Sequence, residues 1–341
     1  SMIEHLKSGL SVSTHIGCPM GCPYCVLSKL NEFKKKPERS MTPEKIIETL
    51  KKKSTLFLNE KTPLLVNNRT DPLLPAVLDD TMRLLELFVE ESVRSPILII
   101  SKFPLDASLK HFFEKLNLLY IYSYSNIVED FNYSNLKRDL EIISKNVPED
   151  SRFHYFRPII PGYNDDLDQM IGILKKFSLY RFSGSIITGF RVTSENRKLL
   201  PNLIEYDPHH KIIKPDLYDK IISLLAIEGL DYPVYRHTSC MIAAHDKKGC
   251  QLLYFRRKHH CSDQCSNYKI CYSVEEKDLV GIKREIEKKF GDSFICEIEE
   301  GTLAIHSPVS QEQVAYIKNA YGIKVQAKDI LLSPSEREIL Q

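Results

Sequence analysis

The chain has 341 residues, of which 43% are hydrophobic, and its 47 basic and 45 acidic side chains leave a formal net charge of only +2. Such a near balance does not by itself indicate a nucleic-acid partner, and no stretch approaches the ~18 consecutive apolar residues of a membrane-spanning helix. No secretory signal is visible, and nine cysteines in such a chain favour metal ligation over a disulfide frame. We therefore expect a cytoplasmic protein that has no membrane partner.

Strand-like and helix-like segments alternate along the first 240 residues, a rhythm that predicts a parallel α/β fold. The segment 97–101 is apolar almost throughout, as parallel strands buried on both faces tend to be. Thr42 followed by Pro43 predicts a helix start. The expected strands are 10–14, 63–67, 97–101, 118–123, 153–159, 184–188 and 233–237, and the other expected helices lie at 81–91, 136–145, 167–177 and 217–227.

Polar residues follow the expected strands at the points where they end. Because the carboxyl ends of parallel strands meet at one edge of a sheet, these residues are candidates for a shared site. The polar segments are 67–72, 101–102, 123–126, 157–165 and 188–191.

Cys18, Cys22 and Cys25 form a C-x3-C-x2-C run close to the N-terminus, which we call the Cys triad. Three thiolates cannot complete a four-ligand tetrahedral site, but they suit a [4Fe–4S] cube in which one iron stays open. A zinc knuckle is the alternative interpretation, and His15 is the only close candidate for its fourth ligand.

A second group of cysteines is packed into 32 residues near the C-terminus. Soft thiolates at this density select an iron–sulfur cluster or zinc, and both remain open. Cys240 is set apart because it closely follows the expected strand 233–237, so we expect it to act at the active site as a hydrogen donor or to serve as a ligand. The other members are Cys250, Cys261, Cys265 and Cys271.

The Cys triad, with Tyr24 before its last cysteine, resembles the signature of radical S-adenosylmethionine (SAM) enzymes. The segments 68–75, 101–102 and 156–165 resemble the spore photoproduct lyase-like branch, so that the resemblance covers roughly residues 10–240. The Cys-rich tail resembles the half-size auxiliary cluster region called a twitch domain. Two features depart from the lyases themselves, namely the position of the Cys loop near the N-terminus and the added tail.

The resemblance implies a partial (βα)6 TIM-like barrel that holds a [4Fe–4S] cluster on the Cys triad and SAM on the open iron. Reductive cleavage of SAM would give a 5′-deoxyadenosyl radical, which abstracts hydrogen from a peptide, a nucleotide or DNA, or a small molecule. The electron would come from a donor such as flavodoxin or ferredoxin, and Cys250, Cys261, Cys265 and Cys271 would hold a second [4Fe–4S] cluster. The implied cofactor-binding residues are Tyr24, Asn67, Asn68, Arg69, Thr70, Asp71, Lys102, Ser123, Ser125 and Arg157.

We expect three regions: the partial barrel at 2–239, the Cys-rich segment at 240–273, and a small α+β module at 274–341. The module should contain helices near 283–290 and 311–321 and strands near 294–297 and 302–306. The alternative to a radical SAM enzyme is a zinc- or iron–sulfur-stabilised protein that binds nucleic acid or transfers electrons.

Iron content tests the second cluster. Anaerobically reconstituted wild type should contain about eight irons per chain, because two cubes of four are expected. A variant with all three triad cysteines replaced by alanine should keep about four. One cluster together with one tightly bound zinc in the wild type would show that the tail is a structural zinc site.

Overall fold

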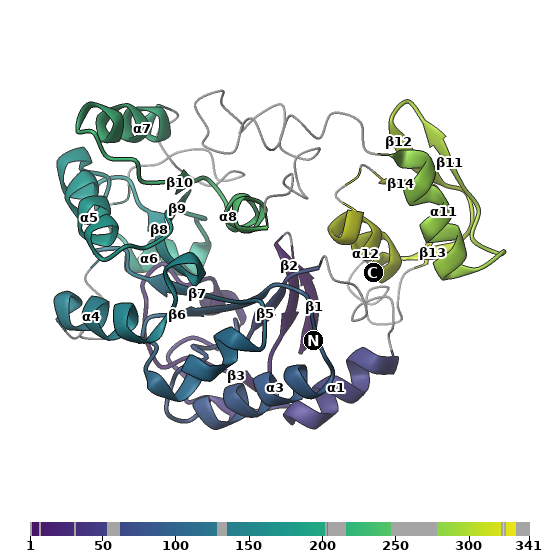
Figure 1. Ribbon diagram of the computed structural model, residues 1–341, viewed down its shortest axis with the longest axis horizontal. Coiled ribbons are helices and arrows are strands. Elements are labelled where there is room, and N and C mark those ends of the chain that lie inside the picture. The colour runs from purple at the N-terminus through teal and green to yellow at the C-terminus, as the bar shows by residue number, and fades with distance from the viewer. Residues whose placement is uncertain are drawn as a thin grey trace.

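The structure is a computed structural model that describes residues 2–6, 8–30, 32–52, 62–127, 135–201, 203, 216–246, 278–321, 323 and 325–331. Its main feature is an eight-stranded sheet of order β1-β2-β5-β6-β7-β8-β9-β10 (Figure 1). All neighbours from β2 to β10 pair in parallel, and only β1 runs antiparallel to β2. The strands are β1 (Ile3–Leu6), β2 (Gly9–Val12), β5 (Leu64–Val66), β6 (Ile97–Ser101), β7 (Leu118–Ser123), β8 (Arg152–Ile159), β9 (Ser185–Gly189) and β10 (Val234–Tyr235).

Helices connect successive parallel strands and cover one face of this sheet, which we call the outer face (Figure 1). A short antiparallel pair, β3 (His15–Ile16) with β4 (Glu38–Arg39), lies at the two ends of the Cys loop region. The helices of this part are η1 (Val26–Leu30), α1 (Pro43–Lys52), α3 (Leu78–Glu90), η2 (Ala107–Glu114), α4 (Leu136–Asn146), η3 (Glu149–Ser151), α5 (Leu167–Leu179), α6 (Ser194–Leu199), α7 (Leu217–Ile227) and α8 (Thr238–His245).

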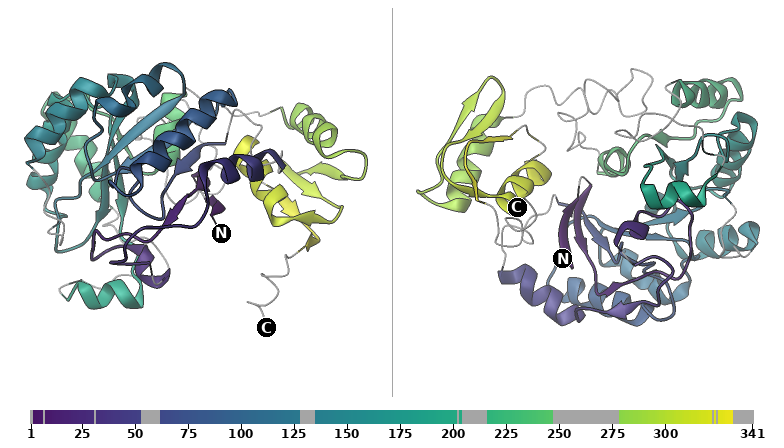
Figure 2. Two further views of the ribbon diagram at one scale, coloured as in Figure 1. Left: turned by 90° about the horizontal axis from the view of Figure 1, so that it is seen from below. Right: turned by 180° about the vertical axis from the view of Figure 1, so that it is seen from behind.

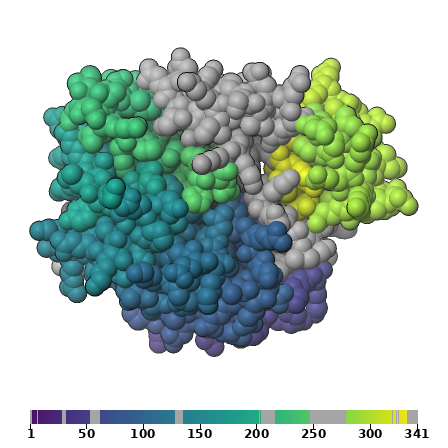
Figure 3. All heavy atoms as spheres, in the orientation of Figure 1, coloured from purple at the N-terminus to yellow at the C-terminus, as the bar shows by residue number. Residues whose placement is uncertain are grey.

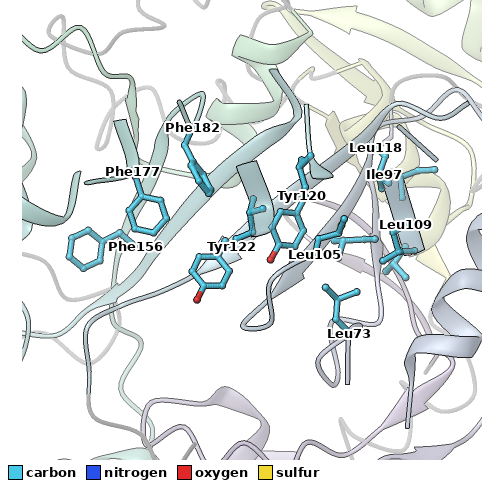
Figure 4. Close-up of a cluster of buried hydrophobic side chains, with 14 of the residues drawn as sticks. Leu73, Ile97, Leu105, Leu109, Leu118, Tyr120, Tyr122, Phe156, Phe177 and Phe182 are labelled. Carbon is cyan, nitrogen blue, oxygen red and sulfur yellow. The ribbon is translucent and has the colours of Figure 1, made fainter. Parts of the chain in front are cut away.

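Alternate residues of each strand supply two separate cores, because successive side chains of a strand point to opposite faces. On the outer face Ile97, Leu118 and Tyr120 pack with residues of η2, as Figure 4 shows. On the opposite, inner face Leu98 and Leu119 pack against helix α8. The near-continuous apolar runs of the sequence therefore reflect strands that are covered on both sides.

The predicted α/β fold is confirmed, and β6, β7 and α7 have the expected bounds. Within the described residues the sheet stays open between its edge strands β1 and β10, which agrees with a partial barrel. The sequence did not predict β1, the 3-10 helix η2 or the short helices α6 and α8, because none of them has a long periodic apolar pattern.

Helix α8 covers the amino-terminal half of the inner face. Met241 and Ile242 pack with the inner-face residues of the strands. His245, the last residue of α8, contacts Asn117 Oδ1 at 3.1 Å and Asp150 O at 3.2 Å, and both of these residues precede strands. The expected boundary between residues 239 and 240 therefore falls inside a helix that packs on the sheet, while the rest of the expected division stays a prediction.

Residues 279–331 form a small module with its own apolar core (Figures 2 and 3). It contains α11 (Leu279–Phe290), β11 (Cys296–Glu299), β12 (Thr302–Ile305), β13 (Val309–Ser310), α12 (Gln311–Tyr321), β14 (Val325–Ala327) and β15 (Ile330–Leu331). Helix α12 contacts the edge strand β1. Among the described helices, none combines the length and apolar character needed to cross a membrane.

His154 on β8 is fully buried between the sheet and α5. Its ring stacks on Phe177 with centroids 3.5 Å apart. One ring nitrogen lies 2.8 Å from the carbonyl oxygen of Tyr124, and the other lies 2.8 Å from Ser185 Oγ. These contacts suit a neutral ring, which donates a hydrogen bond to the carbonyl oxygen and accepts one from the hydroxyl. Burial lowers the pKa of His154 to about 3.

This lowered pKa predicts a loss of stability in acid. Below pH ~6.5 the His154 side chain is protonated in the unfolded chain but stays neutral in the folded protein. The free energy of unfolding should therefore fall by about 1.4 kcal/mol per pH unit as the pH is lowered toward 3. Urea unfolding across pH 4–7 should show this component in wild type and in the control His111→Gln, which alters an exposed histidine, but not in His154→Gln. The same slope in all three proteins would contradict the assignment.

Candidate iron–sulfur and cofactor site

The Cys triad lies on one irregular loop between β3 and η1. Cys22 is buried against Met20, Leu74 and Val77, and the other two thiols are partly buried at the edge of the same cluster. The backbone N–H of Cys25 donates to the carbonyl oxygen of Cys22 at 3.0 Å. The loop thus holds three cysteines, none of them in a disulfide, in one apolar setting next to the segment that follows β5.

The electrostatics of the thiols favour a bound cation. The pKa of the Cys18 thiol is raised to about 11, chiefly by burial and in smaller part by the charges of Asp71 and Cys25. The backbone N–H of Met20 and the ammonium of Lys102 act in the opposite direction. Three soft donors without a complete tetrahedral set fit an iron–sulfur cluster that leaves one iron open. The positive charge of a metal would hold the thiols as thiolates.

Asp71 ties the ends of two neighbouring strands together. It is 6% exposed, and its carboxylate accepts hydrogen bonds from Ser101 Oγ at 2.6 Å, Lys102 N at 2.8 Å and Leu73 N at 3.0 Å. Burial raises the pKa of Asp71, and the three hydrogen bonds oppose this shift. Asp71 therefore fixes the loop after β5 against the end of β6, and its expected role in binding SAM stays a prediction.

Lys102 and Ser125 connect the strand ends to the Cys loop through Tyr24. The ammonium of Lys102 donates to Tyr24 Oη at 2.7 Å, and Ser125 Oγ lies 3.4 Å from the same oxygen. The Tyr24 ring also contacts the apolar residues that follow β7, β8 and β9. Tyr24 therefore hydrogen-bonds with the segments that follow β6 and β7 and packs against an apolar cluster at the same edge of the sheet.

Asn67, Asn68 and Thr70, which follow β5, differ from one another in their hydrogen-bond partners. Asn67 has φ 52°, a left-handed conformation that asparagine tolerates, and its side chain accepts from Thr14 N at 2.7 Å. Asn68 accepts a hydrogen bond from Ser11 Oγ. The Thr70 hydroxyl is buried and has no hydrogen-bond partner among the described residues, which leaves it available to a cofactor.

Arg69 is an ion-pair partner in this structure. Its guanidinium pairs with the buried carboxylate of Glu32 and lies 3.6 Å from Glu4. Glu32 in turn accepts the backbone N–H of Cys18 at its carbonyl oxygen, at 3.0 Å. Arg69 thereby holds the far side of the Cys loop, a role that sequence reasoning missed because Glu32 has no motif of its own.

Arg157 and Ser123 lie on the strands farther from the triad. Arg157 donates to Tyr155 Oη, and that hydroxyl lies 3.3 Å from Thr238 Oγ1 at the start of α8. Ser123 is half-buried at the end of β7. The expected contacts of Arg157 and Ser123 with SAM stay predictions. Asn164, also missed, donates to Ser125 O at 2.7 Å and fixes that loop.

Cys240 lies in the first turn of α8 rather than directly after a strand, and it is 8% exposed among the inner-face apolar residues. His15, the alternative zinc ligand, is buried with Nδ1 2.9 Å from Thr14 Oγ1 and 3.7 Å from an Asp80 oxygen. The four cysteines expected to hold a second cluster, Cys250, Cys261, Cys265 and Cys271, lie outside the described residues.

Comparison with known proteins shows the fold. No family model and no curated protein matches the sequence. Spore photoproduct lyase with a dinucleoside spore photoproduct aligns at a TM-score of 0.52 and 13% identity, over 68% of this chain and 78% of that one. A lyase variant with bound AdoMet and the same ligand aligns at 0.53 and 12%, over the same shares. Streptococcus suis SuiB bound to S-adenosylmethionine aligns at only 0.46 and 10%, over 72% of this chain and 54% of that one.

Replacing the Asp71 carboxylate should destabilise the site. In Asp71→Asn the side-chain NH2 replaces one carboxylate oxygen and cannot accept a hydrogen bond. At least one of the three buried donors would then lack an acceptor, so we expect the free energy of unfolding to fall by about 1–3 kcal/mol. Urea unfolding measures this loss. The exposed residue of α3 in Asp79→Asn provides a matched control, which should change stability by no more than about 1 kcal/mol. Equal stability of the two variants would contradict the role of Asp71.

Proposed function

We propose that the protein is a radical SAM enzyme that cleaves S-adenosylmethionine reductively and abstracts hydrogen from a substrate. The observation that carries the proposal is the position of three cysteines outside any disulfide on one loop, joined through Tyr24 to the carboxyl ends of parallel strands. In parallel α/β folds the active site is built at that edge. The shared fold of spore photoproduct lyase, including a form with bound AdoMet, supports the same proposal.

The residues divide the work as follows. The triad would hold three irons of a [4Fe–4S] cluster, and the fourth iron would accept the amino and carboxylate groups of SAM. When bound, the reduced cluster supplies the electron that breaks a carbon–sulfur bond of SAM and so provides a radical for hydrogen abstraction. The Thr70 hydroxyl and the Lys102 ammonium would be polar partners for SAM, which is supported by the buried, unpartnered Thr70 Oγ1 and by the charge interaction of Lys102 with Cys18. The Asp71 carboxylate positions Lys102 by accepting a hydrogen bond from the backbone N–H of Lys102.

The apolar side chains around the Cys triad help to exclude water from the site. Met20, Leu74 and Val77 surround the buried ligand Cys22, and they limit solvent access to the cluster. A dry site lowers the local dielectric constant and protects a radical from side reactions. The Cys loop thus supplies both the iron ligands and part of their enclosure.

Several parts of the proposal rest on the sequence. We propose a second [4Fe–4S] cluster on Cys250, Cys261, Cys265 and Cys271, supported by their density. Cys240 remains a candidate hydrogen donor or ligand, and its place on the inner face of the sheet supports a role inside the fold. The substrate class remains open between a peptide, a nucleotide or DNA, and a small molecule. Oxygen-sensitive thiolate ligands support a cytoplasmic location.

Alanine replacement of the triad tests the proposal. Cys18→Ala, Cys22→Ala and Cys25→Ala should each abolish formation of 5′-deoxyadenosine from SAM under reducing conditions, because each removes one iron ligand. The control Cys296→Ala removes a buried thiol in the C-terminal module and should retain cleavage. Substantial SAM cleavage by the triple triad variant would refute the assignment.

A further inference from the structure

The β11–β12 hairpin of the C-terminal module carries two glutamates on its solvent side (Figure 1). Glu297 and Glu299 lie two residues apart on β11, so they share one face of the strand, and both are exposed. Cys296, between them and Phe294 in the alternation, points to the opposite face and is buried in the core of the module. The hairpin therefore holds two carboxylates side by side outside its core.

His306 reaches the same carboxylates from the other strand of the hairpin. It directly follows Ile305 of β12, and its backbone N–H donates to the carbonyl oxygen of Ile295 at 2.9 Å. Ile305 faces the core, so the next side chain points to the side of the glutamates. His306 Nε2 lies 3.3 Å from Glu299 Oε1 and 3.9 Å from Glu297 Oε2. One ligand atom from each of the three residues lies within 4.8 Å of the other two.

The Nε2 atom of His306 is an unsatisfied polar atom. It is shielded from solvent and has no hydrogen-bond partner among the described residues, although the two carboxylates lie close to it. The contacts therefore lack the alignment of hydrogen bonds. A buried polar atom in this state calls for a partner such as an ion or a water molecule. The charges point the same way, because two carboxylates held on one face repel each other and a cation relieves that repulsion.

We propose that Glu297, Glu299 and His306 bind one divalent transition-metal ion, for which Zn²⁺ fits best. Zn²⁺ accepts imidazole and carboxylate ligands, and three protein ligands with water in the fourth position form a tetrahedral site. Ligand atoms about 2.1 Å from one ion lie about 3.4 Å apart at tetrahedral angles, close to the separations of Nε2 from the two carboxylates. Ca²⁺ and Mg²⁺ fit less well, because they prefer six or more oxygen ligands. The ion would tie β11 to β12, and the proposal is independent of the Cys triad.

Lys328 limits the affinity of this site. Its ammonium lies 3.4 Å from His306 Nδ1 and can only donate, so in this contact Nδ1 accepts and a neutral ring carries its proton on Nε2. A metal ligand nitrogen must be free of its proton. Metal binding therefore moves the ring proton to Nδ1, and the exposed Lys328 side chain turns away. A hydrogen-bond acceptor at position 328 would instead hold the Nδ1–H and strengthen metal binding.

Titration of the full-length protein with Mn²⁺ tests the proposal, because Mn²⁺ accepts carboxylate and imidazole ligands but competes poorly for the cysteine thiolates. Electron paramagnetic resonance measures the free Mn²⁺ and so gives the affinity. Wild type should bind Mn²⁺, and excess Zn²⁺ should displace it, because Zn²⁺ binds such ligands more tightly. His306→Gln and Glu297→Gln/Glu299→Gln should each lower the Mn²⁺ affinity at least about tenfold, whereas Lys328→Gln should raise it about tenfold.

A matched control removes two carboxylates elsewhere. Glu86→Gln/Glu90→Gln changes two exposed glutamates one turn apart on α3, which pair with Arg83 and have no histidine between them. This variant should bind Mn²⁺ within about twofold of wild type, because its charge change is the same but the ligand set is intact. Far-ultraviolet circular dichroism of every variant should match wild type, which separates loss of the site from loss of the fold.

The outcomes separate a metal site from an acidic surface. If His306→Gln binds Mn²⁺ as tightly as wild type, the glutamates only attract cations and the site is overturned. The same conclusion follows if wild type binds no Mn²⁺, or if excess Zn²⁺ fails to displace it. An affinity of Lys328→Gln at or below that of wild type would overturn the assignment of Nε2 as the ligand atom.

Discussion

The buried carboxylate of Asp71 is the contact on which the arrangement of the site depends. It accepts hydrogen bonds from the segment after β5 and from the end of β6, and one of these bonds fixes the backbone of Lys102. Lys102 then reaches Tyr24 inside the Cys loop. A loop with irregular backbone would otherwise have few constraints relative to the sheet. The contacts from the end of β6 to the Asp71 carboxylate, and from the Lys102 ammonium to the Tyr24 hydroxyl, supply these constraints.

The acidic groups Cys18 and Asp71 lie in an apolar setting, which affects what the site can bind. Burial raises the pKa of both Cys18 and Asp71, so the protein alone disfavours two negative charges there. The ammonium of Lys102 partly offsets them. A site that gathers acids in an apolar setting is suited to a ligand that brings positive charge, as iron does. The same apolar setting then keeps water away from that ligand.

The sequence predicted those features whose signal is local. The strand 97–101 was predicted to the residue because an apolar run between turn residues has few alternative structures. The cysteine spacing predicted a shared ligand loop, and Lys102 reaches that loop through Tyr24, while its expected contact with the cofactor stays a prediction. The pairing of Arg69 with Glu32 was not predictable, because it joins residues far apart in sequence that form no motif. Helix α8, which carries Cys240, was not predicted, because it is short and has no amphipathic pattern.

Helix α8 has a consequence for what the fold can accommodate. Its apolar residues occupy the inner face of the sheet beside the amino-terminal halves of the strands, and His245 anchors its end there. The packing of this part of the inner face is therefore set by one helix and not by the length of the strands. Substitutions at Met241, which is fully buried in that layer, would change this packing without altering any strand or any cysteine of the triad. The inner face could thus be repacked from α8 alone while the Cys loop stays the same.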